Sequence, residues 1–220
     1  MNIGFFGTPE LAASVLAGLA EQHRVTFAVT GEDRPAGRNR EIQFCPAKSA
    51  AIRLGIPVFQ PASLKDPAFP DGIRGFDADA FVVVAYGMLI PRAVFAHPRL
   101  GTLNLHPSLL PRYRGAAPIQ WALINGETET GISVQLINEK LDAGDIVVQE
   151  KLAVAPDMTA GDIMEIVAST GTGLIGRALA LLDSGASPAR QDDSLATYCG
   201  KIDRDTALIN WNNLPRGILN

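Results

Sequence analysis

Short apolar runs alternate with longer amphipathic stretches along most of the 220-residue chain. Apolar runs bounded by turn residues predict strands, which we expect at residues 2–6, 25–30, 58–60, 81–85, 101–108, 131–137 and 146–154. Apolar residues at helical spacing predict helices at residues 10–21, 46–54, 118–125 and 160–183. Strand, helix and strand follow one another at the start, as in a right-handed parallel unit. The pattern therefore predicts an α/β domain with a Rossmann-like, open, mostly parallel sheet and helices on both faces.

Local signals mark where some of these elements begin and end. Thr8 is the expected N-cap of the first helix, and Thr159 with Asp162 forms a capping-box-like pair at the start of the last. Residues 31–45 are polar and aperiodic, which predicts an exposed loop. Glycine inside a helix costs about 1 kcal/mol relative to alanine, and close packing on the sheet would explain three in the last helix, at 171, 173 and 176.

The run Phe81–Ala85 is continuously apolar, which predicts a central strand covered on both faces. Residues 86–91 turn off its carboxyl end, where ligands of open α/β sheets bind. The first strand-to-helix turn has only Gly4 and Gly7, so the G-x-G-x-x-G dinucleotide fingerprint is absent.

Three polar residues suit an acyl transfer. Asn104 and His106 alternate along the strand at 101–108 and should share one face at its end. Asp142 follows the strand at 131–137 and can orient the histidine. An amide that stabilises an oxyanion and an imidazole that moves a proton need no metal and no covalent enzyme intermediate.

Composition narrows the class of protein. The chain is 47% hydrophobic and 19% charged, which suits one compact domain. It has no run of 18 apolar residues and no basic-then-apolar leader, so we expect no membrane span and a cytoplasmic location. Cys45 and Cys199 fit no metal-ligand spacing and are expected to be free thiols.

Four segments carry a family resemblance, from about residue 3 to the end: Phe6–Pro9, Asp33–Arg38, Asn104–Gly115 and Asp142–Asp145. Together they are similar to the 10-formyltetrahydrofolate-dependent formyltransferases, and most similar to the members that formylate initiator methionyl-tRNA. The resemblance implies that Asn104, His106 and Asp142 are catalytic and that 10-formyltetrahydrofolate is the formyl donor. It implies folate contacts by Tyr86, Gly87, Met88, Leu89, Ile90, Ser108, Leu109, Pro111, Leu136 and Asp142.

The resemblance also assigns the loop from Asp33 to Lys48 to the tRNA acceptor stem. Its expected phosphate contacts are Arg34, Arg38, Arg40 and Lys48. Three acidic residues in and beside the loop leave it a small positive balance. The whole chain carries a net charge of −4, unlike most stand-alone nucleic-acid binders.

In the family a second, basic domain helps to hold the tRNA. We therefore expect a monomer with a catalytic domain at residues 1–205, followed at 206–220 by the start of a linker to a domain absent from this chain. We expect the side chain of Arg112 to be solvated at the tip of its loop, and we expect Arg114 to make a structural or ligand contact.

Two other functions stay open. A formyltransferase acting on an amino sugar nucleotide would share the Asn, His and Asp set and the folate donor, but it would have no use for the loop at 33–48. A catalytically silent folate-binding module would bind a folate analogue without turnover. A purine-pathway formyltransferase fits less well, because residues 113–118 and Trp121 resemble the tRNA type.

Overall fold

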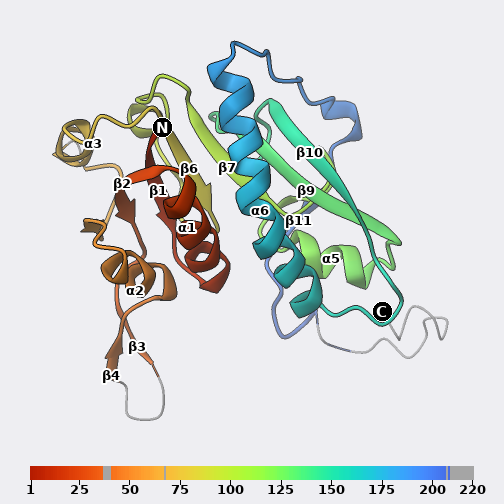
Figure 1. The fold of residues 1–220 in the computed structure, drawn as a ribbon. Helices are drawn as coiled ribbons and strands as arrows, with labels where there is room; N and C mark the ends of the chain where they lie inside the picture. The colour runs from red at the N-terminus through yellow and green to blue at the C-terminus, as the bar shows by residue number, and fades with distance from the viewer. Residues whose placement is uncertain (37–40, 67, 207, 209–220) are drawn as a thin grey trace.

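The computed structural model describes residues 1–36, 41–66, 68–206 and 208 of the chain. Its centre is a seven-stranded sheet in the order β10-β9-β7-β6-β1-β2-β5 (Figure 1). These strands are β1 (Asn2–Gly7), β2 (Arg24–Val29), β5 (Val58–Phe59), β6 (Ala80–Val84), β7 (Thr102–His106), β9 (Glu129–Leu136) and β10 (Ile146–Ala153). The first five run parallel, whereas β9 is antiparallel to β7 and β10 is antiparallel to β9. The sheet is therefore mostly parallel, which confirms the predicted α/β class.

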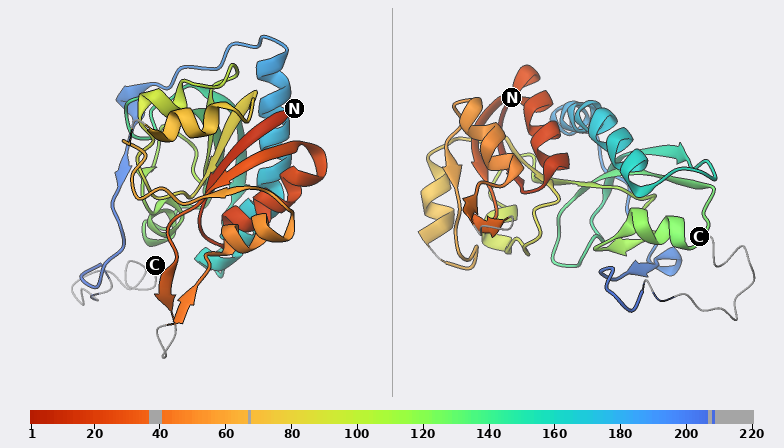
Figure 2. Two further views of the ribbon diagram at one scale, coloured as in Figure 1. Left: turned by 90° about the vertical axis from the view of Figure 1, so that its left-hand side faces the viewer. Right: turned by 90° about the horizontal axis from the view of Figure 1, so that it is seen from below.

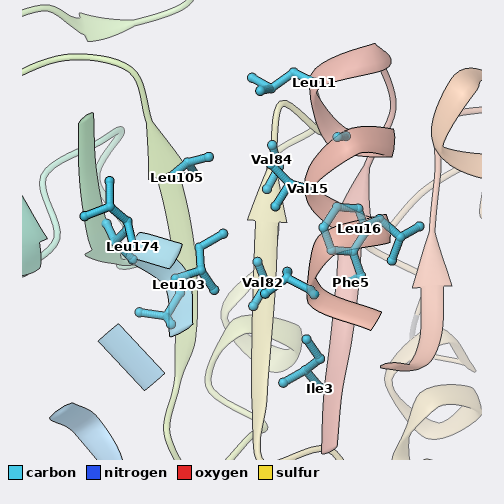
Figure 3. Close-up of a cluster of buried hydrophobic side chains, with 14 of the residues drawn as sticks. Ile3, Phe5, Leu11, Val15, Leu16, Val82, Val84, Leu103, Leu105 and Leu174 are labelled. Carbon is cyan, nitrogen blue, oxygen red and sulfur yellow. The ribbon is translucent and has the colours of Figure 1, made fainter. Parts of the chain in front are cut away.

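Helices cover both faces of the sheet, as predicted. The helices are α1 (Glu10–Gln22), α2 (Pro46–Arg53), α3 (Ala68–Arg74), α4 (Arg92–Phe95), α5 (Pro118–Ile124) and α6 (Ala160–Asp183). In β6, Val82 and Val84 belong to a core that includes residues of α1 and α6, whereas Phe81 and Val83 belong to a core with residues of α3 and α4. Figure 3 shows the first of these cores. Burial on both faces is why β6 is apolar at every position.

Two local predictions were wrong. Thr8 does not cap α1: the N-cap residue is Pro9, and the Thr8 hydroxyl instead donates to the Tyr86 carbonyl and accepts from the Gly31 N–H, each at 3.2 Å. The segment 31–45, expected to be an exposed loop, contains the antiparallel strands β3 (Arg34–Ala36) and β4 (Glu41–Gln43). Residues 37–40 between them lie outside the described residues, and with them Arg38 and Arg40.

The last helix was predicted correctly at both ends, and its capping box of Thr159 and Asp162 is formed. Of its glycines, Gly171 packs closely on the sheet, because a Cβ there would lie 2.7 Å from Leu105 Cδ2. A Cβ at Gly173 would meet nothing within 4 Å, so packing explains only part of the pattern. By length and composition alone α6 could cross a membrane, but core helices of globular domains can meet the same criteria. The buried side chains of α6 belong to the core that it forms with α1 and the sheet.

After α6 the chain returns across the end of the sheet (Figure 2). Ala189 bridges Ile146 at the start of β10, and a 3₁₀ turn follows at Asp193–Leu195. The short strand β11 (Tyr198–Cys199) then pairs in parallel with β8 (Arg114–Gly115). We refer to residues 186–200 as the return segment. The sequence pattern did not predict its elements, nor β8, α3 or α4.

Candidate active site

A cavity of about 900 Å³ lies at the carboxyl ends of β1, β6 and β7. Successive strands extend the sheet outward from β1 through β2 to β5, and then from β6 through β7 on the other side. The direction of strand order thus reverses between β1 and β6, and ligands of open α/β sheets bind at such a reversal. The cavity is at the edge where the sequence predicts a ligand site.

The turn after β6 forms one wall of the cavity. Ala85 has φ of 44° and Gly87 has φ of 84°, so the chain reverses sharply in left-handed backbone conformations. The turn presents the side chains of Met88 and Leu89, both exposed, and the buried side chain of Ile90. Tyr86 also lines this wall, and burial raises the pKa of its hydroxyl above the ordinary value.

β7 brings Asn104 and His106 to the cavity on the same face. The antiparallel partner β9 sets Gln135 opposite Asn104 and Ser133 opposite His106. Two pairs of polar residues therefore face each other in the middle of otherwise apolar strands. The side chains of His106, Ser133 and Gln135 are all buried.

The hydrogen bond of the His106 ring fixes its tautomer. Nε2 lies 2.9 Å from the Tyr113 carbonyl oxygen. A carbonyl can only accept, so Nε2 carries a proton and Nδ1 is the nitrogen left to gain or lose one. Nδ1 lies 3.8 Å from Asp142 Oδ2, too far for a hydrogen bond but close enough for an ionic interaction when the ring is charged. The Tyr113 carbonyl therefore orients the ring, while Asp142 acts on its other nitrogen through charge.

Asp142 sits in the loop after β9 with φ of 48°, an uncommon conformation for a residue with a side chain. Its Oδ1 accepts from Asn104 Nδ2 at 3.4 Å and from Gln135 Nε2 at 3.2 Å. Its Oδ2 accepts from the Gly115 N–H at 2.9 Å. One hydrogen of the Asn104 amide is thus directed to Asp142, and the other remains for a ligand.

Several residues at the cavity were not among the predicted site residues. Gln135 contacts the Asp142 carboxylate, and Lys140 and Lys201 line the cavity and bring positive charge to it. Gln135 had a sequence signal, since it is an uncharged polar residue inside an apolar strand. Lys201 had no such sequence signal, because it reaches the cavity only through the path of the return segment that precedes it.

Three predicted folate contacts lie away from the cavity lining: Ser108, Leu109 and Pro111. Ser108 is fully buried, its hydroxyl donates to the Arg112 carbonyl at 2.8 Å, and its own carbonyl accepts from Ser133 at 2.6 Å. These bonds hold the turn that presents Tyr113. The other predicted contacts, including Leu136, line the cavity.

Of the two arginines near the site, Arg112 is half-exposed and pairs with Glu127, as expected for a solvated tip. Arg114 is structural: its guanidinium is buried and donates to Gln191, Asp193 and Tyr198. Burial acts to lower the pKa of Arg114, but its bonds to Asp193 and Tyr198 raise it above the ordinary value.

Among the predicted tRNA contacts, Lys48 points inward. Its Nζ donates to Asp33 Oδ2 at 2.5 Å and to Gln60 Oε1 at 2.6 Å, and its side chain is 14% exposed. These bonds from Lys48 and Gln60 hold the pKa of the Asp33 carboxyl below its usual range. The charge of Lys48 is therefore paired within the protein. Of the other three, Arg34 lies in β3, and Arg38 and Arg40 are outside the described residues.

Within the described residues, no three His, Cys, Asp or Glu side chains form a group that could hold a metal ion, and both cysteines are free thiols. The Asn104 amide, the His106 imidazole and the Asp142 carboxylate meet at a cavity with one apolar wall, which Glu10, Lys140 and Lys201 also line. Such a set can stabilise an oxyanion and move a proton.

The chain is similar to known proteins along its whole length. The protein from Nitrobacter hamburgensis named methionyl-tRNA formyltransferase is 45% identical over 221 residues, which span 100% of this chain and 71% of that protein. The one from Syntrophus aciditrophicus with the same name is 40% identical over 222 residues, again 100% of this chain and 71% of that protein.

The fold matches that of WlaRD, a sugar 3N-formyl transferase crystallised in the presence of dTDP and 5-N-formyl-THF. The TM-score is 0.73 at 16% identity, over 100% of this chain and 77% of that one. A family model described as formyl transferase matches residues 1–179, most of the chain. The chain belongs to the formyl transferase family.

Proposed function

We propose that this protein transfers the formyl group of 10-formyltetrahydrofolate to the α-amino group of methionyl-tRNA. One observation carries the proposal: Asn104, His106 and Asp142 meet at one cavity in a chain that is 40–45% identical to proteins named for this reaction. The initiator tRNA is the proposed form of the substrate, and the cytoplasm is the proposed location.

The reduced folate supplies the formyl carbon and leaves as tetrahydrofolate. The free amide hydrogen of Asn104 donates to the formyl oxygen as negative charge develops there. A donor of this kind is worth about 3 to 4 kcal/mol in the transition state. Asp142 holds Asn104 in this orientation through the bond at Oδ1.

His106 moves the proton that the amine loses on forming the new C–N bond to the folate nitrogen released when the old bond breaks. Nδ1 is the atom that carries it, because Nε2 is occupied by the Tyr113 carbonyl. Asp142 Oδ2, 3.8 Å from Nδ1, is close enough to interact by charge with the ring while it carries this proton. Removing any one of Asn104, His106 and Asp142 should lower the rate by about 10²-fold or more.

The apolar wall from Tyr86 to Ile90, with Leu136, fits a flat pterin ring, which needs backbone polar groups beside apolar side chains. Lys140 and Lys201 would face the negative charges of a folate tail or of the tRNA end. The tRNA stem is assigned to the hairpin of β3 and β4 through Arg34, Arg38 and Arg40. Residues 1–205 would be the catalytic domain of a monomer.

The test is a formyl-transfer assay by mass spectrometry with 10-formyltetrahydrofolate and three acceptors: methionyl-tRNA, an amino sugar nucleotide and glycinamide ribonucleotide. Turnover is expected with methionyl-tRNA alone. Turnover on the sugar nucleotide instead would favour the sugar-modifying alternative. Folate binding without turnover on any acceptor would favour the silent binding module.

A second measurement tests the assigned tRNA surface. Each phosphate contact contributes about one unit to the slope of log K against log salt. Because the charge of Lys48 is paired within the protein, Arg34, Arg38 and Arg40 remain as the assigned phosphate contacts. The slope of log K against log salt should therefore be shallow for this chain. Arg38→Ala should weaken tRNA binding, and Lys48→Ala should leave the slope unchanged.

A further inference from the structure

Gln191 in the return segment connects a buried arginine to the loop that carries Asp142. Its side chain is 6% exposed and makes five hydrogen bonds. Oε1 accepts from Arg114 Nε at 3.0 Å and from Arg114 Nη2 at 2.8 Å. Nε2 shares its two hydrogens among three acceptors, the main-chain carbonyls of Asp142 at 3.0 Å and Gly144 at 2.6 Å and Gln135 Oε1 at 3.1 Å.

The direction of each bond is fixed by chemistry. Arginine only donates, so the oxygen of the Gln191 amide must face Arg114, and its nitrogen must face the loop. The Asp142 carboxylate only accepts, so Gln135 must turn its nitrogen to Asp142 and its oxygen to Gln191 and the Gly144 N–H. A directed series of donors therefore runs from Arg114 through Gln191 and Gln135 to the Asp142 carboxylate.

The loop needs such support because its conformation is strained and crowded. Asp142 has φ of 48°, and a Cβ at Gly144 would lie 1.5 Å from the Leu136 carbonyl oxygen. Residues in uncommon backbone conformations persist when their surroundings over-determine them. Gln191 is the side chain that holds the carbonyls of both residues. Arg114 is in turn anchored by Asp193 at 2.8 Å, which is exposed at the surface.

We propose that Gln191, fixed in orientation by Arg114, is a positioning residue that sets the Asp142 loop for formyl transfer. This inference rests on the proposed function. Gln191 does not line the cavity, and it acts on the reaction through Asp142 and Gln135.

The central variant is Gln191→Glu, which keeps the acceptor for Arg114 and removes the N–H donors to the loop. Displacing a catalytic group by about 1 Å can cost about 10²-fold, so kcat should fall by about 10- to 100-fold. The matched control is Gln60→Glu. Gln60 likewise accepts from a cation, Lys48, and donates to a main-chain carbonyl, that of Gly31, and to the Asp33 carboxylate. Unlike those of Gln191, its hydrogen-bond partners in the described part of the chain lie outside the Asp142 loop. Its kcat should stay within about twofold of wild type.

A double-mutant cycle separates positioning from a loss of folding. In an Asp142→Ala background, Gln191→Glu should change kcat by less than about twofold, because the group it positions is already gone. The same fold-loss in both backgrounds would overturn the proposal. So would a kcat for Gln191→Glu within about twofold of wild type.

Hydrogen exchange gives a readout that does not depend on activity. The Gly115 N–H donates to Asp142 Oδ2 and the Gly144 N–H to Gln135 Oε1, so both amides should exchange faster in Gln191→Glu and not in Gln60→Glu. If the wild type does not formylate methionyl-tRNA, the proposed function fails, and this exchange measurement still tests whether Gln191 sets the loop.

If Gln191→Glu does not fold by circular dichroism, Asp193→Asn takes its place, because Asp193 is 61% exposed and its change leaves the core intact. Loosening Arg114 in this way should lower kcat by about two- to fivefold and speed exchange at the same two glycines. No change in either quantity would overturn the proposal.

Discussion

Asp142→Asn is the sharpest single test of how the site is built. The change keeps the size of the side chain but leaves one acceptor oxygen in place of two. The wild-type carboxylate accepts from Asn104 and Gln135 on Oδ1 and from the Gly115 N–H on Oδ2. The asparagine amide must therefore turn its nitrogen toward at least one donor.

The cheaper orientation keeps the oxygen toward Asn104 and Gln135 and leaves the Gly115 N–H without its acceptor. An unsatisfied donor costs about 1 to 3 kcal/mol when it is fully buried, and the Gly115 N–H is half-buried, so the cost here should be about 1 kcal/mol. For a domain of this size, about 1 kcal/mol corresponds to about 2 to 4 °C in Tm, so Tm should fall by about 2 to 4 °C. The ionic interaction with His106 Nδ1 is lost in either orientation, and we expect the formyl-transfer rate to fall by about 10²- to 10³-fold.

The assay is single-turnover formyl transfer followed by mass spectrometry, together with thermal unfolding of the same samples. Asp145→Asn is the control, since Asp145 is an exposed carboxylate in the same loop. A rate for Asp142→Asn within about threefold of wild type would refute the assigned role of the carboxylate. An unchanged Tm would contradict the account of the Gly115 bond.

Two further predictions concern stability. Hydrogen bonds from Lys48 and Gln60 depress the pKa of the Asp33 carboxyl, so they stabilise the folded protein above the ordinary carboxyl pKa, and this stabilisation is lost as pH falls through the depressed value. Lys48→Met should therefore reduce the drop in Tm between neutral and acid pH. A drop in Tm identical to that of the wild type would contradict this. Gly171→Ala should destabilise the folded protein by about 1 to 3 kcal/mol, because the new Cβ would crowd Leu105, and the higher helix propensity of alanine offsets part of this. Gly173→Ala should stabilise the folded protein by up to about 1 kcal/mol, because its Cβ would meet nothing within 4 Å. Urea unfolding of both variants compares their free energies of unfolding directly.

The parts of the structure that were predictable from sequence depend on local pattern. The apolar run of β6 and the capping box of α6 are each encoded within a few residues, and the helix and strand order follows from such signals. Asn104 and His106 share a face because alternate residues of any strand do so. Asp142 was expected near them because it follows the strand at 131–137, and the family resemblance supported this; no local rule fixes how the loop after β9 folds back.

The features that the sequence pattern did not predict depend on contacts between residues far apart in the sequence. Thr8 has the residue type of an N-cap, but its hydroxyl bonds to Tyr86 and Gly31, which are distant in sequence. Lys48 counts as a free cation in any charge sum, although Asp33 and Gln60 enclose it. The roles of Gln135 and Gln191 depend on strand register and on the path of the return segment, and neither can be read from a window of sequence.

The return segment also determines how small a working catalytic unit can be. The match to the family model ends at residue 179, within α6. The side chains to which Arg114 donates hydrogen bonds lie beyond that point: Gln191, Asp193 and Tyr198. A protein cut at 179 would bury a guanidinium with these partners removed, and it would leave Gly115 without the β11 strand beside it. Chimeras that exchange acceptor specificity between relatives should therefore place their junction after Lys201, which is itself a residue of the cavity wall.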